Sequence, residues 1–157
     1  MKIEQIDLSH LDAITPVFDA YRVWYRQPTD LSNARTFLSE RIRNQESIIY
    51  GAFNSDKQLV GFTQLYPLFS STRMGRLWLL NDLFVKPEYR GQGISLLLIE
   101  RVKVLANETN AVGILLETEK SNQIGNQLYP RAGFHLEEET HYYFWKNEEQ
   151  PKNGYSE

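Results

Sequence analysis

The chain has 157 residues, no cysteine and a formal net charge of -3, from 17 basic and 20 acidic residues. The lack of cysteine excludes disulfides, cysteine-ligated zinc and a cysteine acyl carrier, and the weakly acidic balance argues against general nucleic-acid binding. Its length and its 41% of hydrophobic residues predict one domain with its own core. We expect a cytoplasmic protein without a membrane partner, since no apolar run approaches the roughly 20 residues that span a bilayer and no signal core is present.

The first half of the chain predicts one strand, two helices and three strands. Residues 2–6 have a strand pattern, and apolar side chains then recur at helical spacing as far as Tyr25. Pro28 ends that helix or follows its end, and Asp30 or Ser32 is expected to cap the next one. The three predicted strands that follow are residues 47–53, 59–66 and 76–85.

The second half predicts two helices among further strands. A helix is expected over residues 93–106, then a strand over 111–118 and a short helix capped by Asn122. Residues 134–137 and 141–145 are expected to close the sheet. This order of elements is typical of an α+β protein with one mixed sheet, formed by residues 1–147 and followed by a polar tail at 148–157.

A glycine-rich loop lies between the strand ending at Val85 and the next predicted helix. Glycines let a backbone approach a ligand closely, and the N–H groups at a helix start favour an anion, so this order predicts a phosphate site. The loop lacks the Gly-Lys-Ser/Thr ending of nucleotide-hydrolysing phosphate loops, and Leu96 occupies the third glycine position of the dinucleotide pattern. The loop reads Arg90-Gly91-Gln92-Gly93-Ile94-Ser95.

Two spaced signatures resemble the GCN5-related N-acetyltransferase (GNAT) family. Arg90 and Gly93 match its pyrophosphate loop, Arg-x-x-Gly-x-(Gly/Ala), and Ser95 replaces the last small residue. Asn122 and the pairs Leu128-Tyr129 and Gly133-Phe134 match its second signature. The resemblance extends from about residue 1 to 146, and the segments LNDLFVKPEYRGQG and GFTQLYPLFSS look like the histone/polyamine acetyltransferase-like branch.

The resemblance implies a central mixed, mostly antiparallel sheet flanked by helices, with a splayed strand pair that admits acetyl-coenzyme A. It implies acetyl transfer to a primary amine by direct attack, with both substrates bound and no metal. The expected acceptor is a small molecule, such as a polyamine or an amino acid, and a protein lysine or N-terminus is left open. The implied coenzyme-binding residues are Leu83, Phe84, Val85, Arg90, Gly91, Gln92, Gly93, Ile94, Ser95, Asn122 and Tyr129.

Two side chains are candidates for catalysis. Tyr129 matches the family's general acid, which protonates the leaving thiolate, although Pro130 predicts an irregular helix beside it. Some relatives carry Glu-Asp where this chain has Asn81-Asp82, so Asp82 becomes the candidate base or ammonium ligand. Strand alternation predicts that these two side chains lie on opposite faces.

Other residues add to the acceptor prediction without settling it. Tyr21, Trp24 and Tyr25 are either an aromatic wall for an ammonium group or ordinary packing, and Glu117 and Glu119 either attract that group or are solvated. A non-catalytic acyl-coenzyme A sensor is the alternative, supported by Asn81 and Pro130, and another nucleotide-binding domain is the third. The aromatic run at residues 142–145 suggests a homodimer formed through the C-terminal strands.

Overall fold

The computed structural model describes residues 1–149 and has one five-stranded sheet with the strands in chain order. The first four strands pair antiparallel, and the last two pair parallel. The predicted mixed, mostly antiparallel sheet of an α+β protein is therefore confirmed. The strands are β1 Lys2–Gln5, β2 Ile48–Phe53, β3 Leu59–Ser70, β4 Gly75–Val85 and β5 Gly113–Leu115.

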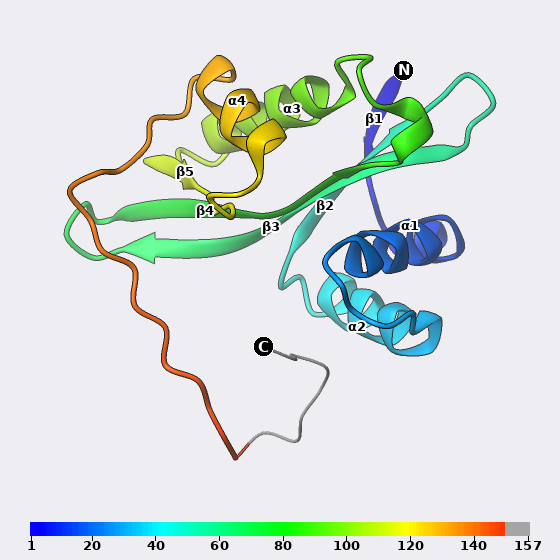
Figure 1. Ribbon diagram of the computed structural model, residues 1–157, viewed down its shortest axis with the longest axis horizontal. Coiled ribbons are helices and arrows are strands. Elements are labelled where there is room, and N and C mark those ends of the chain that lie inside the picture. The colour runs from blue at the N-terminus through cyan, green and yellow to red at the C-terminus, as the bar shows by residue number, and fades with distance from the viewer. Residues whose placement is uncertain (150–157) are drawn as a thin grey trace.

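The helices cover both faces of this sheet. On one face lie α1 (Leu11–Trp24) and α2 (Leu31–Arg43), and on the other lie α3 (Ile94–Glu108) and α4 (Gln123–Arg131) (Figure 1). Both faces of the central strands are therefore covered, which explains why β2 and β3 are almost continuously apolar. The residues buried under α1 and α2 are Ile6, Leu11, Ile14, Val17, Phe18, Ala34, Leu38, Ile49, Leu59, Phe62 and Phe84. Those buried under α3 and α4 are Tyr50, Ala52, Val60, Leu65, Trp78, Leu80, Val85, Ile94, Leu98, Ile99, Val102, Leu105 and Ala132.

Asp30 is the residue that caps α2. Its Oδ1 accepts a hydrogen bond from the backbone N–H of Asn33 at 3.0 Å, which satisfies one of the N–H groups that a helix start leaves without a partner. Ser32 lies inside the helix instead. Of the two capping residues that the sequence offers, Asp30 is therefore the correct one.

The strand pair β4 and β5 is splayed. The two strands pair only from Leu77 with Gly113 to Leu79 with Leu115, after which β5 ends. Since β4 continues to Val85, the edge of residues 80–85 that faces away from β3 has no strand beside it among the described residues. This edge is the gap in which the sequence predicts that the coenzyme binds.

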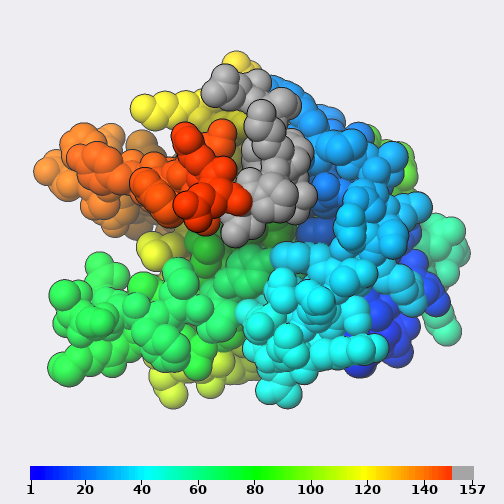
Figure 2. All heavy atoms as spheres, turned by 90° about the horizontal axis from the view of Figure 1, so that it is seen from below, coloured from blue at the N-terminus to red at the C-terminus, as the bar shows by residue number. Residues whose placement is uncertain are grey.

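The prediction of two strands after α4 is wrong. Residues 134–149 form no strand and extend away from the sheet (Figure 1), and in Figure 2 the segment, orange to red, stands off the green β3–β4 hairpin. A strand forms only where an edge can pair with it, and β5 offers three residues. The aromatic pattern alone could not supply that partner, and Tyr143 and Trp145 are 87% and 80% exposed.

Candidate active site

A β-bulge shapes the middle of β4. Asp82 pairs with Gln64 and Leu80 pairs with Leu65, so Asn81 is an extra residue with no partner on β3. The Asn81 Nδ2 donates a hydrogen bond of 3.0 Å to Asp82 Oδ1, so the two side chains are in contact. The expectation that alternation separates them is therefore wrong, because alternation holds only for a strand without an inserted residue.

The backbone beyond the bulge presents alternate residues to the gap. The N–H of Lys86 donates to the Val60 carbonyl at 2.9 Å, so this position faces β3. Because the backbone groups of successive residues alternate in direction, Phe84 also faces β3, while Leu83 and Val85 face the gap. Phe84 instead contributes its side chain, which is buried under α1.

The loop after β4 leaves the start of α3 open. Gly91 and Gly93 have φ angles of +74° and +76°, in the left-handed region that suits glycine. Gly93 is the N-cap residue of α3, and no side chain caps the helix. No atom lies within 4 Å of where a Cβ would stand on either glycine. The N–H groups of the first turn therefore have no side-chain cap, and the loop before them is uncrowded, as a phosphate site requires.

Arg90 connects this loop to α1 rather than to the start of α3. Its Nε donates a hydrogen bond of 3.0 Å to the Val85 carbonyl. Its guanidinium lies 4.2 Å from the ring centroid of Trp24 and 5.7 Å from that of Phe84, within the range of cation–π contacts. The guanidinium is thus held at the end of β4, against the last turn of α1.

Asn122 acts as the cap of α4. Its Oδ1 accepts from the Gly125 N–H at 3.0 Å, and its Nδ2 donates to Thr118 Oγ1 at 2.9 Å. An added Cβ on Gly125 would stand only 2.6 Å from the Asn122 Nδ2, so the glycine is needed for this close approach. Both ends of the Asn122 amide are used inside the chain, which accounts for the asparagine by capping alone.

Tyr129 is fixed near the end of α4. Its carbonyl accepts hydrogen bonds from the N–H groups of Ala132 and Phe134 at 3.1 and 3.0 Å, and its ring packs edge-on against Phe134. Burial, aided by the nearby Tyr25, raises the pKa of Tyr129 to about 12. The helix continues through Pro130 to Arg131, so the expected irregularity does not interrupt it.

Asp82 is a buried carboxyl held by polar side chains. Its Oδ2 accepts from Gln64 Nε2 at 2.9 Å, and Gln64 Oε1 accepts from the Ser47 hydroxyl at 3.0 Å. Asp82 is only 5% exposed, and burial raises its pKa, although hydrogen bonds from Gln64, Tyr21 and Asn81 act in the opposite direction. Sequence reasoning missed Gln64 and Ser47. The only sequence signal for this group was the presence of a glutamine inside an apolar strand.

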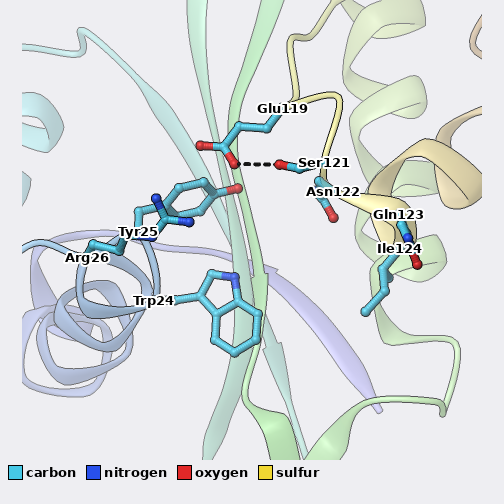
Figure 3. A pocket seen from close by; sticks show the side chains of 8 residues that line it. All are labelled: Trp24, Tyr25, Arg26, Glu119, Ser121, Asn122, Gln123 and Ile124. Atoms are coloured by element: carbon cyan, nitrogen blue, oxygen red, sulfur yellow. Dashed lines mark hydrogen bonds between the residues drawn. The ribbon is translucent and has the colours of Figure 1, made fainter. Parts of the chain in front are cut away.

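A pocket of about 420 Å³ opens between the end of α1 and the start of α4. Figure 3 shows its two walls facing each other, with the side chains of Trp24, Tyr25 and Arg26 on one wall. On that wall, the Trp24 ring contacts the Arg90 guanidinium, and the Tyr25 ring centroid lies 5.0 Å from that of Tyr21. The pocket therefore links the loop to the neighbourhood of Asp82. The opposite wall consists of Glu119, Ser121, Asn122, Gln123 and Ile124.

Comparison with known proteins identifies this arrangement. The sequence model of the acetyltransferase (GNAT) family matches residues 12–134. The chain belongs to this family. An uncharacterized N-acetyltransferase of Bacillus subtilis, YhfO, is 42% identical over 140 residues, which cover 89% of this chain and 92% of the relative. A probable acetyltransferase of Haemophilus influenzae is 29% identical over 117 residues, which cover 74% of this chain and 80% of the relative.

A solved structure gives the same result for the GNAT fold. The crystal structure of a probable acetyltransferase superimposes with a TM-score of 0.91 at 36% identity and covers 96% of this chain and all of its own. The predicted family, fold class and N-acetyltransferase activity are therefore confirmed. The family generally uses acetyl-coenzyme A as co-substrate, and the open, glycine-lined start of α3 suits its pyrophosphate.

Two further observations concern the described part of this acetyltransferase. Residues 1–149 contain no group of three or more histidine, cysteine, aspartate or glutamate side chains placed to hold a metal ion. They also contain no helix of the length and apolarity that crossing a membrane requires.

Proposed function

We propose that this acetyltransferase moves the acetyl group of acetyl-coenzyme A to a primary amine of a small molecule, with both substrates bound together. The observation that carries the proposal is the free edge of β4, which passes Asp82, ends at Val85 and is followed by the loop to the uncapped start of α3. The names of three relatives support a small amine, namely a streptothricin, an aminoglycoside and a thialysine acetyltransferase from Escherichia coli, Acinetobacter baumannii and Bos taurus.

The backbone groups of Leu83 and Val85 would hold the pantetheine arm as an added strand, since both face the gap. One of their N–H groups would donate to the thioester oxygen, where negative charge develops, and such a donor is worth roughly 3 kcal/mol. Phe84 supports this edge through its buried side chain. The pyrophosphate would lie at the first turn of α3, bound by the backbone of Gly91, Gln92, Gly93, Ile94 and Ser95.

Asp82 is our candidate for the group that receives the ammonium proton of the acceptor. An amine attacks only as the free base, and a carboxyl whose pKa is raised by burial is a better proton acceptor than an exposed one. Tyr21 lies beside this carboxyl and packs against Tyr25, so an aromatic surface leads from the pocket to it. Such a surface also suits an ammonium group by cation–π contact.

Tyr129 is proposed to stabilise the leaving sulfur mainly as a hydrogen-bond donor. Its pKa of about 12 lies above that of an ordinary thiol, about 8.5, so complete proton transfer is unfavourable by on the order of a thousandfold. We expect Tyr129→Phe to lower kcat by about tenfold to a hundredfold, with little change in coenzyme affinity. Steady-state kinetics and calorimetry measure the two quantities, and an unchanged kcat would contradict the role.

The proposed function is tested by the release of free thiol from acetyl-coenzyme A in the presence of different amines. The panel contains polyamines, amino acids of both hands, aminoglycosides and lysine peptides. The chain has no cysteine and adds no thiol background. Release with one class of small amine supports the proposal, and release with lysine peptides alone replaces it with protein acetylation. Coenzyme binding without any release would favour the sensor alternative.

We also propose that the protein forms a homodimer through the segment after α4. Tyr142, Tyr143, Phe144 and Trp145 are each at least 75% exposed, and the outer edge of β5 has no partner among the described residues. Pairing with a second copy would cover both. Sedimentation velocity at micromolar concentration should show a dimer that Trp145→Glu dissociates, and a monomeric parent chain would contradict the proposal.

A cytoplasmic location remains the prediction that accompanies this function.

A further inference from the structure

Two opposite charges face the pocket from its two walls. Arg26 lies on the α1 wall, and Glu119 lies on the wall before α4. Among residues 1–149, neither side chain takes part in an ion pair. A pocket with one cationic and one anionic wall is complementary to a ligand that carries both charges.

The backbone holds Arg26 in this position. Its φ is +64°, in the left-handed region, and its N–H donates to the Val23 carbonyl at 3.0 Å. The next N–H, of Gln27, donates to the Arg22 carbonyl at 3.0 Å and completes the turn that ends α1. Glycine is the residue that this turn favours. Gln45 makes the same turn at the end of α2, so the turn fixes where the Arg26 side chain leaves the helix, and its place in the pocket lining carries the argument.

Glu119 is held equally firmly on the opposite wall. Its carbonyl accepts from the Asn122 N–H and from Asn126 Nδ2, both at 3.0 Å, and its Oε2 accepts from the Ser121 hydroxyl at 3.1 Å (Figure 3). Its charge contributes, after burial, to the raised pKa of Tyr25. Glu119 is an exposed residue of this wall, and its carboxylate lies close enough to Tyr25 to act on that hydroxyl.

We propose that the acceptor is a diamino acid, whose α-carboxylate binds Arg26, whose α-ammonium binds Glu119, and whose side-chain amine is acetylated. This assignment names the acceptor of the function proposed above and rests on it. The guanidinium fork matches a carboxylate in two parallel hydrogen bonds, and the glutamate pairs with an ammonium group. The methylene stem of the acceptor would pack along the rings of Tyr25 and Tyr21, which lead to Asp82.

The charges favour this acceptor over the simpler amines. A polyamine would bring a second ammonium group beside Arg26, where like charges repel, and a monoamine would leave both charged walls without a partner. In the reaction, the side-chain nitrogen forms a bond to the acetyl carbon as the carbon–sulfur bond breaks. The ammonium loses two protons, of which one goes to the departing thiolate and the other to Asp82 and then to solvent.

The test compares acceptors that differ by one charge. The probes are L-lysine and L-ornithine, their decarboxylated diamines cadaverine and putrescine, and Nα-acetyl-L-lysine. We expect the diamino acids to have the highest kcat/KM. Arg26→Gln should raise KM for them by about tenfold or more and leave KM for the diamines unchanged or lower. Glu119→Gln should raise KM for L-lysine but not for Nα-acetyl-L-lysine. Arg43→Gln, at the end of α2, is the matched control and should change none of these values.

A binding measurement reads the same pocket without turnover. Calorimetry of L-lysine and L-ornithine against the protein saturated with coenzyme A should show binding that Arg26→Gln weakens and Arg43→Gln does not. If no diamino acid binds, or if the diamines are acetylated as well as the diamino acids, the proposal is overturned although the protein remains an amine acetyltransferase. If coenzyme A binds and no amine of the wider panel releases thiol, the proposed function itself fails.

Discussion

Gly93→Asp is expected to weaken the binding of acetyl-coenzyme A by at least about a hundredfold, because two effects combine. Gly93 has a φ of +76°, where any other residue is strained by roughly 1–2 kcal/mol. Its position is also the N-cap of α3, where an aspartate would place its carboxylate against the N–H groups that the pyrophosphate needs. The new carboxylate would thus repel the coenzyme and compete with it.

Two control variants separate these effects in titration calorimetry. Gly93→Ala introduces the backbone strain without the charge and should cost about tenfold. Arg90→Ala should cost less than Gly93→Asp, since the guanidinium already bonds to the Val85 carbonyl and covers Trp24. A larger loss with Arg90→Ala would contradict the account of a cradle built mainly from backbone. Circular dichroism establishes that each variant is folded.

The parts of the fold that depend on local patterns could be predicted from the sequence. Helical spacing located α1, α2 and α3, and Asn122 marked the start of α4, because these signals involve residues that are neighbours on one helix. The loop from Arg90 to Ser95 was identifiable because its glycines and the following apolar helix are contiguous. The two predicted C-terminal strands failed because their existence depends on a distant edge, which offers only the three residues of β5.

The candidate site depends more strongly on contacts that sequence spacing does not encode. The sequence identified Asp82 as a candidate but not its partner Gln64, because that pairing follows from the register of β3 against β4. The bulge at Asn81 was also hidden, since a strand with an inserted residue looks like an uninterrupted one. Arg26 was missed because its position depends on a left-handed turn after α1. Such a turn usually contains glycine, so an arginine in the sequence does not predict it.

Asp82→Asn is expected to lower kcat/KM by about a hundredfold or more, while the folded protein becomes no less stable. A general base must be ionised, so the activity of the parent protein should fall as the pH decreases through the raised pKa of Asp82. The contribution of Asp82 to folding stability changes with pH in the opposite direction to the activity. The folded state keeps the proton of this carboxyl at pH values where the unfolded chain, with a pKa of about 3.9, has lost it. The contribution of Asp82 to stability is therefore greatest below that value and is lost as the pH rises through the folded pKa.

An uncharged asparagine removes the cost of burying the ionised carboxylate and still accepts a hydrogen bond from Gln64. Thermal unfolding of Asp82→Asn at neutral pH should give a Tm equal to or above that of the parent, in contrast to the loss of activity. Asn81→Ala is the matched control, because it removes a hydrogen bond to the same carboxyl without removing the base. If Asp82→Asn lowers both Tm and activity while its pH–rate profile keeps the shape of the parent's, the carboxyl is structural and the proton leaves by another route.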